Sequence, residues 1–186
     1  MPAGLTDTEL AAYVKGYGHR FDDYVDLEVP ILISPEQYAQ IIAWCEPYME
    51  RRHEVQGAVT FHIEGGEKIV LERVFVMGGN SLSLPTTCKF DPDDMLRQIQ
   101  EHYPDRTAFK SDQVGLWHLH PGYYPDLSVG DVEECRKTLS DYATKVLHLL
   151  MYGNGFGYQL SGYLIGLEEV NRLPVRIQPN FGKDAQ

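Results

Sequence analysis

The chain has 186 residues, of which 43% are hydrophobic and 23% charged, as in a soluble globular protein of single-domain size. Its formal net charge of -11 argues against a nucleic-acid-binding module, because such a surface needs clustered Lys and Arg. No apolar run approaches the roughly 18 to 20 residues that span a bilayer, and no secretory signal opens the chain, so we expect a cytoplasmic protein without a membrane partner.

The three cysteines predict reduced thiols. Cys45, Cys88 and Cys135 are odd in number, widely spaced and not in a C-x-x-C pair. A disulfide framework needs paired cysteines, so we expect mostly buried, reduced side chains.

The pattern along the chain predicts one domain with two flanking segments. Residues 1–24 form an N-terminal extension with a short helix at Thr8–Lys15, and residues 179–186 form a C-terminal tail. The regular signals lie between them, in residues 25–178. No repeat or linker divides this central part, so we expect it to fold as one unit.

The first elements of this domain are a strand and a helix. Val25–Ile33 is predicted to be a strand. Ser34 and Gln37 form a capping box around a proline at the first helical position, which predicts a helix ending near Glu50, with a disturbance at Pro47.

A hairpin and a second helix follow. Glu54–Ile63 and Lys68–Met77 are predicted strands, joined by a Gly-Gly turn. Asn80–Lys89 is predicted to be a polar loop, and Asp91 begins a helix that runs to about Tyr103.

The last third of the chain alternates strand, helix and strands. Gln113–His120 is a predicted strand, and Ser128 caps a third helix after a loop rich in Pro, Gly and Tyr. Two or three strands close the chain: Lys145–Tyr152 and Tyr158–Ile165, with Pro174–Gln178 left open as a third. The order β-α-β-β-α-β-α-β-β predicts a mixed sheet with helices packed on it, an α/β or α+β layered fold.

The segment after residue 117 predicts a metal site. Side chains alternate along a strand, so His118 and His120 project to the same side, about 7 Å apart along the chain. Asp131, in the first turn of the third helix, brings a carboxylate within reach of the same ion. Two histidines and one carboxylate leave the fourth position of a tetrahedral zinc ion to water, which is the arrangement of a catalytic site.

Zinc-dependent hydrolysis needs two further groups. Ser128 could donate a hydrogen bond to the developing oxyanion, and a carboxylate near the water would act as general base. Glu54 is the candidate base, although sequence patterns alone do not distinguish it from the other glutamates of the predicted hairpin. These are Glu64, Glu67 and Glu72.

The pattern resembles the JAMM motif of the JAB/MPN metallopeptidases. It is Glu54, then His118-Leu119-His120-Pro121, then Ser128-Val129-Gly130-Asp131, and the resemblance extends over roughly Val25 to Gln178. Leu119 departs from it, because Ser or Thr is common between the two histidines.

The resemblance implies the MPN/JAB (cytidine-deaminase-like) fold, in which helices flank a curved mixed sheet. By this resemblance the positions of His118, His120 and Asp131 hold one zinc ion, Glu54 is the acid/base carboxylate and Ser128 assists the oxyanion.

The resemblance also implies an activity. Such enzymes typically cut the isopeptide bond between the C-terminal Gly of ubiquitin, or of a ubiquitin-like modifier, and a lysine. The expected partners are therefore the modifier, its conjugates and the activating- and conjugating-enzyme-like proteins of the same system. The compact chain is similar to prokaryotic members, some of which serve antiphage defence operons.

Two other functions stay open. The domain could be a non-catalytic MPN scaffold in a larger assembly, although scaffold members usually lack one or more ligands. It could also be a peptidase for a sulfur-carrier or phage tail protein.

Structural interpretations of single residues also stay open. The two histidines could be hydrogen-bonded strand residues, Asp131 only a capping partner, and Glu54 a solvated edge carboxylate. Trp117 is predicted to face the core on the opposite side of the strand, and Tyr123 and Tyr124 could line a substrate groove. The other histidines are predicted to be surface residues rather than ligands: His19, His53, His62, His102 and His148.

Overall fold

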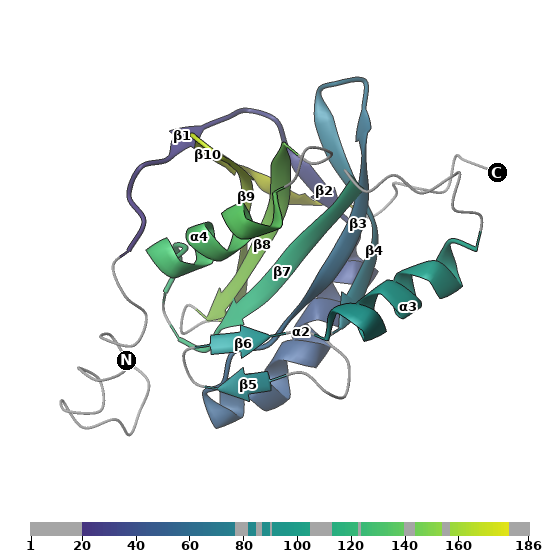
Figure 1. Cartoon of the computed structure of the whole chain (residues 1–186), viewed down its shortest axis with the longest axis vertical. Coiled ribbons are helices and arrows are strands. Elements are labelled where there is room, and N and C mark those ends of the chain that lie inside the picture. The colour runs from purple at the N-terminus through teal and green to yellow at the C-terminus, as the bar shows by residue number, and fades with distance from the viewer. Residues whose placement is uncertain are drawn as a thin grey trace.

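A computed structural model of the chain describes residues 20–76, 82–84, 87–89, 91–104, 113–122, 124–139, 144–153 and 157–178. Over these residues the chain forms a nine-stranded mixed sheet, a two-stranded sheet and three helices (Figure 1). The helices are α2 (Pro35–Arg51), α3 (Pro92–His102) and α4 (Val129–Thr138). The expected α+β arrangement of a mixed sheet with packed helices is therefore confirmed.

The strands of the large sheet lie in the order β1-β10-β9-β8-β7-β3-β4-β2-β11. Their bounds are β1 (Val25–Asp26), β2 (Ile31–Ile33), β3 (Gln56–Glu64), β4 (Lys68–Val76), β7 (Val114–His120), β8 (Lys145–Gly153), β9 (Tyr158–Gly166), β10 (Val170–Leu173) and β11 (Val175–Ile177). The small sheet pairs β5 (Leu82–Leu84) with β6 (Thr87–Lys89).

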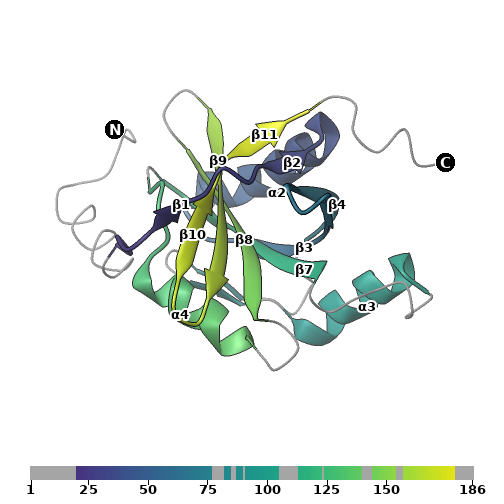
Figure 2. The ribbon, with the colours of Figure 1, turned by 90° about the horizontal axis from the view of Figure 1, so that it is seen from above.

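The large sheet is curled, which follows from its connections. Only Pro174 separates β10 from β11, yet β10 pairs with β9 near one edge and β11 pairs with β2 at the other edge. The backbone amide of Ile31 donates to the carbonyl oxygen of Pro174 at 2.8 Å, so the two edges approach each other at this corner. Figure 2 shows the curled sheet from above.

The helix α2 covers one face of the sheet. The Ser34/Gln37 capping box is formed as predicted, and the helix continues through Pro47 to Arg51. Its buried residues Ile41 and Cys45 belong to the largest core cluster, which also contains Trp117 and Leu119 of β7.

The helices α3 and α4 cover the opposite face (Figure 2). Met95 and Ile99 of α3 pack with Phe75 of β4 in one core cluster. Val132 and Cys135 of α4 pack in another, with residues of β8 and β9. The strand β7 therefore lies between two cores, and alternate residues face α2 or α4.

Three predictions of strands needed correction. The predicted strand Val25–Ile33 is divided into β1 and β2, which lie at opposite sides of the sheet order. Asn80–Lys89, predicted to be a loop, contains β5 and β6. The strand β10 was not predicted, because its sequence Val-Asn-Arg-Leu has no clear apolar run.

The predicted flanking segments are described only in part. Arg20 forms a β-bridge with Ser128 and an ion pair of 3.0 Å with Asp126, and Phe21 and Tyr24 pack against the core of α4. The predicted helix Thr8–Lys15 and the tail 179–186 lie outside the described residues. None of the described helices is long and apolar enough to cross a membrane.

Candidate metal centre

Two imidazoles reach the site from the end of β7. His118 and His120 are 4% and 1% exposed, and both project toward α4. Trp117, which lies between Leu116 and His118 in the strand, points to the other face. There its indole N–H donates to the carbonyl oxygen of Phe75 at 2.8 Å, and its ring stacks on that of Trp44. The predicted alternation of faces is confirmed, because β7 is a regular central strand.

The carboxylate comes from the first turn of α4. Ser128 is the N-cap, and its hydroxyl oxygen accepts from the amide of Asp131 at 3.1 Å. The carboxylate oxygen Oδ2 of Asp131 accepts in return from the amide and the hydroxyl of Ser128, at 2.7 and 2.8 Å. The capping box and the candidate ligand are thus the same residues, and the cap fixes the orientation of the carboxylate.

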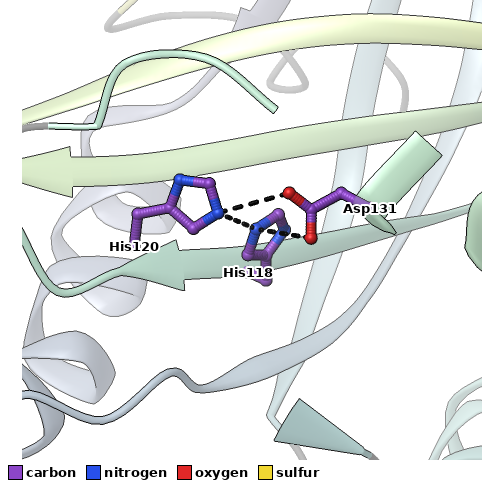
Figure 3. A group of neighbouring side chains, drawn as sticks. All are labelled: His118, His120 and Asp131. Atoms are coloured by element: carbon purple, nitrogen blue, oxygen red, sulfur yellow. Dashed lines mark hydrogen bonds and ion pairs between the residues drawn. The ribbon is translucent and has the colours of Figure 1, made fainter. Parts of the chain in front are cut away.

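The three side chains converge on one point (Figure 3). The Nε2 atoms of His118 and His120 are 2.9 Å apart, and the oxygens Oδ1 and Oδ2 of Asp131 lie 3.7 and 3.4 Å from them, respectively. The edge of a tetrahedron around zinc with bonds near 2.1 Å is about 3.4 Å, so the separations fit one small ion. The predicted grouping is confirmed as one that could hold a metal ion. Two histidines and a carboxylate are ligands of zinc and also of iron(II).

The electrostatics of the group suit a cation. Burial lowers the pKa of His118 well below its ordinary value, so this imidazole is neutral and keeps a lone pair. Burial alone would raise the pKa of Asp131, but His118, His120 and the Ser128 amide together lower it below its usual range. The result at neutral pH is an ionised carboxylate beside a neutral imidazole, the protonation states that bind metals.

The second ring nitrogens of both histidines are also engaged. His120 Nδ1 lies 3.3 Å from the carbonyl oxygen of Tyr124, and His118 Nδ1 lies 2.5 Å from Nε2 of His148. His148 Nδ1 lies 3.0 Å from Sγ of Cys135. The prediction that His148 is a surface residue was wrong: it is 5% exposed, because the central strand β8 is covered on both faces.

Glu54 lies beside this group because of the register of β3 and β7. Gln56 pairs with His118, and the amide of Leu119 donates to the carbonyl oxygen of Val55 at 2.8 Å. Residues opposite each other in antiparallel strands face the same side, so Glu54 is level with His120 on the metal-ligand face. It is 5% exposed, which excludes the solvated edge carboxylate.

The other candidate bases lie elsewhere. Glu64 and Glu67 are exposed at the distant turn of the β3–β4 hairpin, and Glu72 is exposed and paired with His62 at 2.9 Å. Of the four glutamates that the sequence left open, Glu54 is the one next to the metal-ligand group.

Tyr123, a candidate for lining a substrate groove beside the site, lies outside the described residues.

The small hairpin β5–β6 holds Glu54 in place. The hydroxyl of Ser83 donates to the carbonyl oxygen of Glu54 at 2.6 Å, and the thiol of Cys88 forms a hydrogen bond with its carboxyl group. Burial, followed by the charge of Asp131, raises the pKa of Glu54 to about 8. A carboxyl group with a pKa near 8 both accepts and releases protons at neutral pH.

The stability of the metal-free protein should therefore fall between pH 6.5 and pH 8. The pKa of Glu54 is about 8 when folded and near its ordinary value of 4.5 when unfolded, so the folded state binds the extra proton in this window. The lowered pKa values of His118 and His148 act in the opposite direction near pH 6.5, where unfolding takes up protons, and offset part of this loss. Linkage gives a net loss of roughly 1 kcal/mol in the free energy of unfolding, which urea denaturation in chelator would measure.

Glu54→Gln supplies the control for this pH effect. The amide does not titrate, so the variant should show no fall in the free energy of unfolding from pH 6.5 to pH 8. A wild-type protein that likewise shows no fall in this window would show that Glu54 ionises normally when folded.

Comparisons with known proteins identify a shared fold but no family. No family model and no curated protein matches the chain. The solution structure of protein DSY2949 from Desulfitobacterium hafniense is similar, with a TM-score of 0.57 and 16% identity over 84% of this chain and 97% of that one. At this identity the likeness concerns the fold alone.

Proposed function

We propose that this chain is a zinc-dependent peptidase of the JAB/MPN/JAMM type with an MPN fold. Its substrate is the bond after the C-terminal Gly of ubiquitin or a ubiquitin-like modifier, in a cytoplasmic conjugation system. The observation that carries the proposal is the buried group of His118, His120 and Asp131 with Glu54 beside it. The substrate class comes from the resemblance of the JAMM motif.

The metal ligands support zinc hydrolysis through their number and their protonation. Three ligands from the chain leave one position of a tetrahedral site for water. Zinc bound there would act as a Lewis acid and lower the pKa of its water to about 7.

Glu54 is the proton carrier in this proposal. Its carboxylate takes a proton from the attacking water and returns it to the leaving amine. The site is shielded from bulk solvent, since Glu54, His118 and His120 are each at most 5% exposed. A proton held at its carboxyl group is therefore protected from bulk water until the amine leaves.

Ser128 has two roles in the proposal. Its hydroxyl donates to Asp131, which orients the ligand. The same hydroxyl hydrogen can turn to the developing oxyanion, because the amide of Ser128 continues to hold Oδ2 of Asp131 at 2.7 Å.

A fusion of ubiquitin to a reporter peptide after its terminal Gly-Gly tests this function. The zinc-loaded chain should release the reporter, and zinc-stripped protein or a fusion with Val-Val in place of Gly-Gly should not. Only Gly lets a chain pass closely over a narrow site, which is the reason for the Val-Val control.

The outcomes separate the alternatives. Cleavage of a sulfur-carrier fusion in preference to ubiquitin would replace the substrate class and keep the peptidase. A zinc-loaded protein that cleaves neither fusion, nor an isopeptide-linked ubiquitin–lysine conjugate, would contradict the peptidase.

A further inference from the structure

A chain of three buried side chains extends behind the candidate metal ligand His118. Nε2 of His148, on β8, lies 2.5 Å from Nδ1 of His118, and Sγ of Cys135, on α4, lies 3.0 Å from Nδ1 of His148. The exposed fractions are 4% for His118, 5% for His148 and 2% for Cys135. The motif that resembles the JAMM pattern contains neither His148 nor Cys135.

The topology brings these residues together from three elements. The parallel pairing of β7 and β8 places His148 opposite Leu116, so it shares the face of His118 two residues further along β7. Asp131 and Cys135 are four residues apart on α4 and therefore lie on the same side of the helix. One helix face thus presents a carboxylate to the ligand nitrogens and a sulfur to the histidine behind them.

The hydrogen-bond direction follows from the inventory of a neutral imidazole, which has one donor and one acceptor nitrogen. A lone pair on Nε2 of His118, turned toward Asp131, requires the hydrogen on Nδ1, which then donates to Nε2 of His148. The hydrogen of His148 is in turn on Nδ1, and it donates to Sγ of Cys135. The reverse order, in which the Cys135 thiol donates to His148 and His148 donates to His118, puts the hydrogen of His118 on Nε2, where it would block a metal ion. Metal binding therefore selects the first order, in which His148 accepts the Nδ1 hydrogen of His118.

Burial makes the acceptor on His148 necessary. A buried ring N–H without a partner is costly, so metal binding at Nε2 of His118 would be weaker without the Nε2 lone pair of His148. Among the described residues, only Tyr24 and Asn171 have a buried side-chain polar atom without a hydrogen-bond partner, so both nitrogens of His148 are satisfied. A leucine at this position would suit the apolar core of β8 better unless the imidazole is needed for its nitrogens.

We infer that His148 and Cys135 are positioning residues of the metal centre: they hold the ring of His118 in place, and His148 accepts the Nδ1 hydrogen that His118 carries when its Nε2 binds the ion. The inference rests on the proposed function, because the hydrogen bonds of His148 and Cys135 act on metal binding only if His118 is a ligand. Partners of metal-bound histidines typically contribute 10–100-fold to metal affinity.

The test compares zinc affinities in variants of the full chain, by competition with a chromophoric chelator. His148→Leu should weaken zinc binding roughly 10–100-fold, whereas His148→Gln, which keeps one acceptor and one donor, should recover most of the affinity. Cys135→Ala should weaken binding by a smaller factor. Cys45→Ala is the matched control, because Cys45 is equally buried but packs in the core of α2.

A second measurement reads the hydrogen bond to His148 directly. Nitrogen–proton correlation spectra of the zinc-loaded protein should show the Nδ1 hydrogen of His118 shifted downfield by this hydrogen bond in the wild type and in Cys45→Ala, and the shift should be lost in His148→Leu. Thermal melts identify a variant that fails to fold, and His148→Gln and Cys135→Ala then carry the comparison.

The outcomes of the two measurements are distinct. A wild-type protein that binds zinc but cleaves none of the fusions contradicts the proposed function, while its zinc affinity and its spectra still test the inference. Wild-type affinity in folded His148→Leu, or an Nδ1 hydrogen of His118 that is not shifted downfield in the zinc-loaded wild type, overturns the inference.

Discussion

His118→Ala and Asp131→Ala should purify without metal, whereas the wild-type chain should retain about one zinc ion. Either change leaves two ligand groups of the three that lie within 4.8 Å of one another. The measurement is elemental analysis of protein purified without chelator, with zinc and iron determined together because both ions accept this ligand set.

His62→Ala is the matched control for metal content. His62 is also a strand histidine facing a carboxylate, with Nδ1 2.9 Å from Oε1 of Glu72, but it lies on the surface and belongs to no metal-ligand group among the described residues. The His62→Ala variant should retain the zinc content of the wild type. Iron in place of zinc would remove the zinc peptidase from consideration, and no metal in any form of the protein would favour the scaffold.

Thermal stability gives an independent reading of the same variants. An ion that binds only the folded chain stabilises it by about 2.7 kcal/mol at a hundredfold excess over the dissociation constant. Added zinc should therefore raise the Tm of the wild type and of His62→Ala, and leave the Tm of Asp131→Ala unchanged.

The sequence predicts those parts of the fold that depend on residues close together in the chain. The capping boxes of Ser34 and Ser128 and the turn at Gly65 and Gly66 depend on residues within a few positions of each other. The two candidate metal-ligand histidines are also predicted locally, because the alternation of side chains is a property of the strand alone.

Long-range pairing determines the parts that sequence patterns missed. The sequence predicts Val25–Ile33 as one strand, but β1 pairs with β10 and β2 with β4 and β11, so the chain must cross from one edge of the curled sheet to the other. The interruption before β2 falls at Pro30, which has no amide hydrogen to donate. No local pattern specifies which partners the two halves take.

The dependence on long-range pairing also explains which site residues the sequence could not identify. Glu54 could not be chosen from the sequence because the choice depends on the register of β3 against β7. His148 was assigned to the surface because a lone histidine gives no signal by itself. The signal that would have found it is the apolar run on both sides of it, Lys145–Gly153, which predicts a strand buried on both faces.

Replacement of the Glu54 carboxyl group should separate metal binding from turnover. Glu54→Gln is nearly isosteric and leaves the three candidate ligands in place, so the variant should retain zinc. It should lose about 10²–10⁴-fold in kcat on the ubiquitin fusion, because a glutamine does not accept the proton of the attacking water.

Glu64→Gln is the matched control for this loss. Glu64 lies at the other end of the same strand and is exposed, where it pairs with Lys68 at 2.9 Å. The change removes the same charge from the chain without touching the site, so turnover should stay within the error of the wild type. Equal losses in the two variants would trace the effect to net charge rather than to a general base.

The free energy of unfolding makes the interpretation of Glu54→Gln unambiguous. Burial beside Asp131 raises the pKa of Glu54 to about 8, so the ionised carboxylate destabilises the metal-free fold. Glu54→Gln should therefore be more stable than the wild type at pH 8, measured in chelator, while it is less active with zinc. A carboxylate that costs stability and is needed for turnover is placed there for its chemistry. A variant that instead loses stability and activity together would indicate that Glu54 supports the fold through its contacts with Ser83 and Cys88.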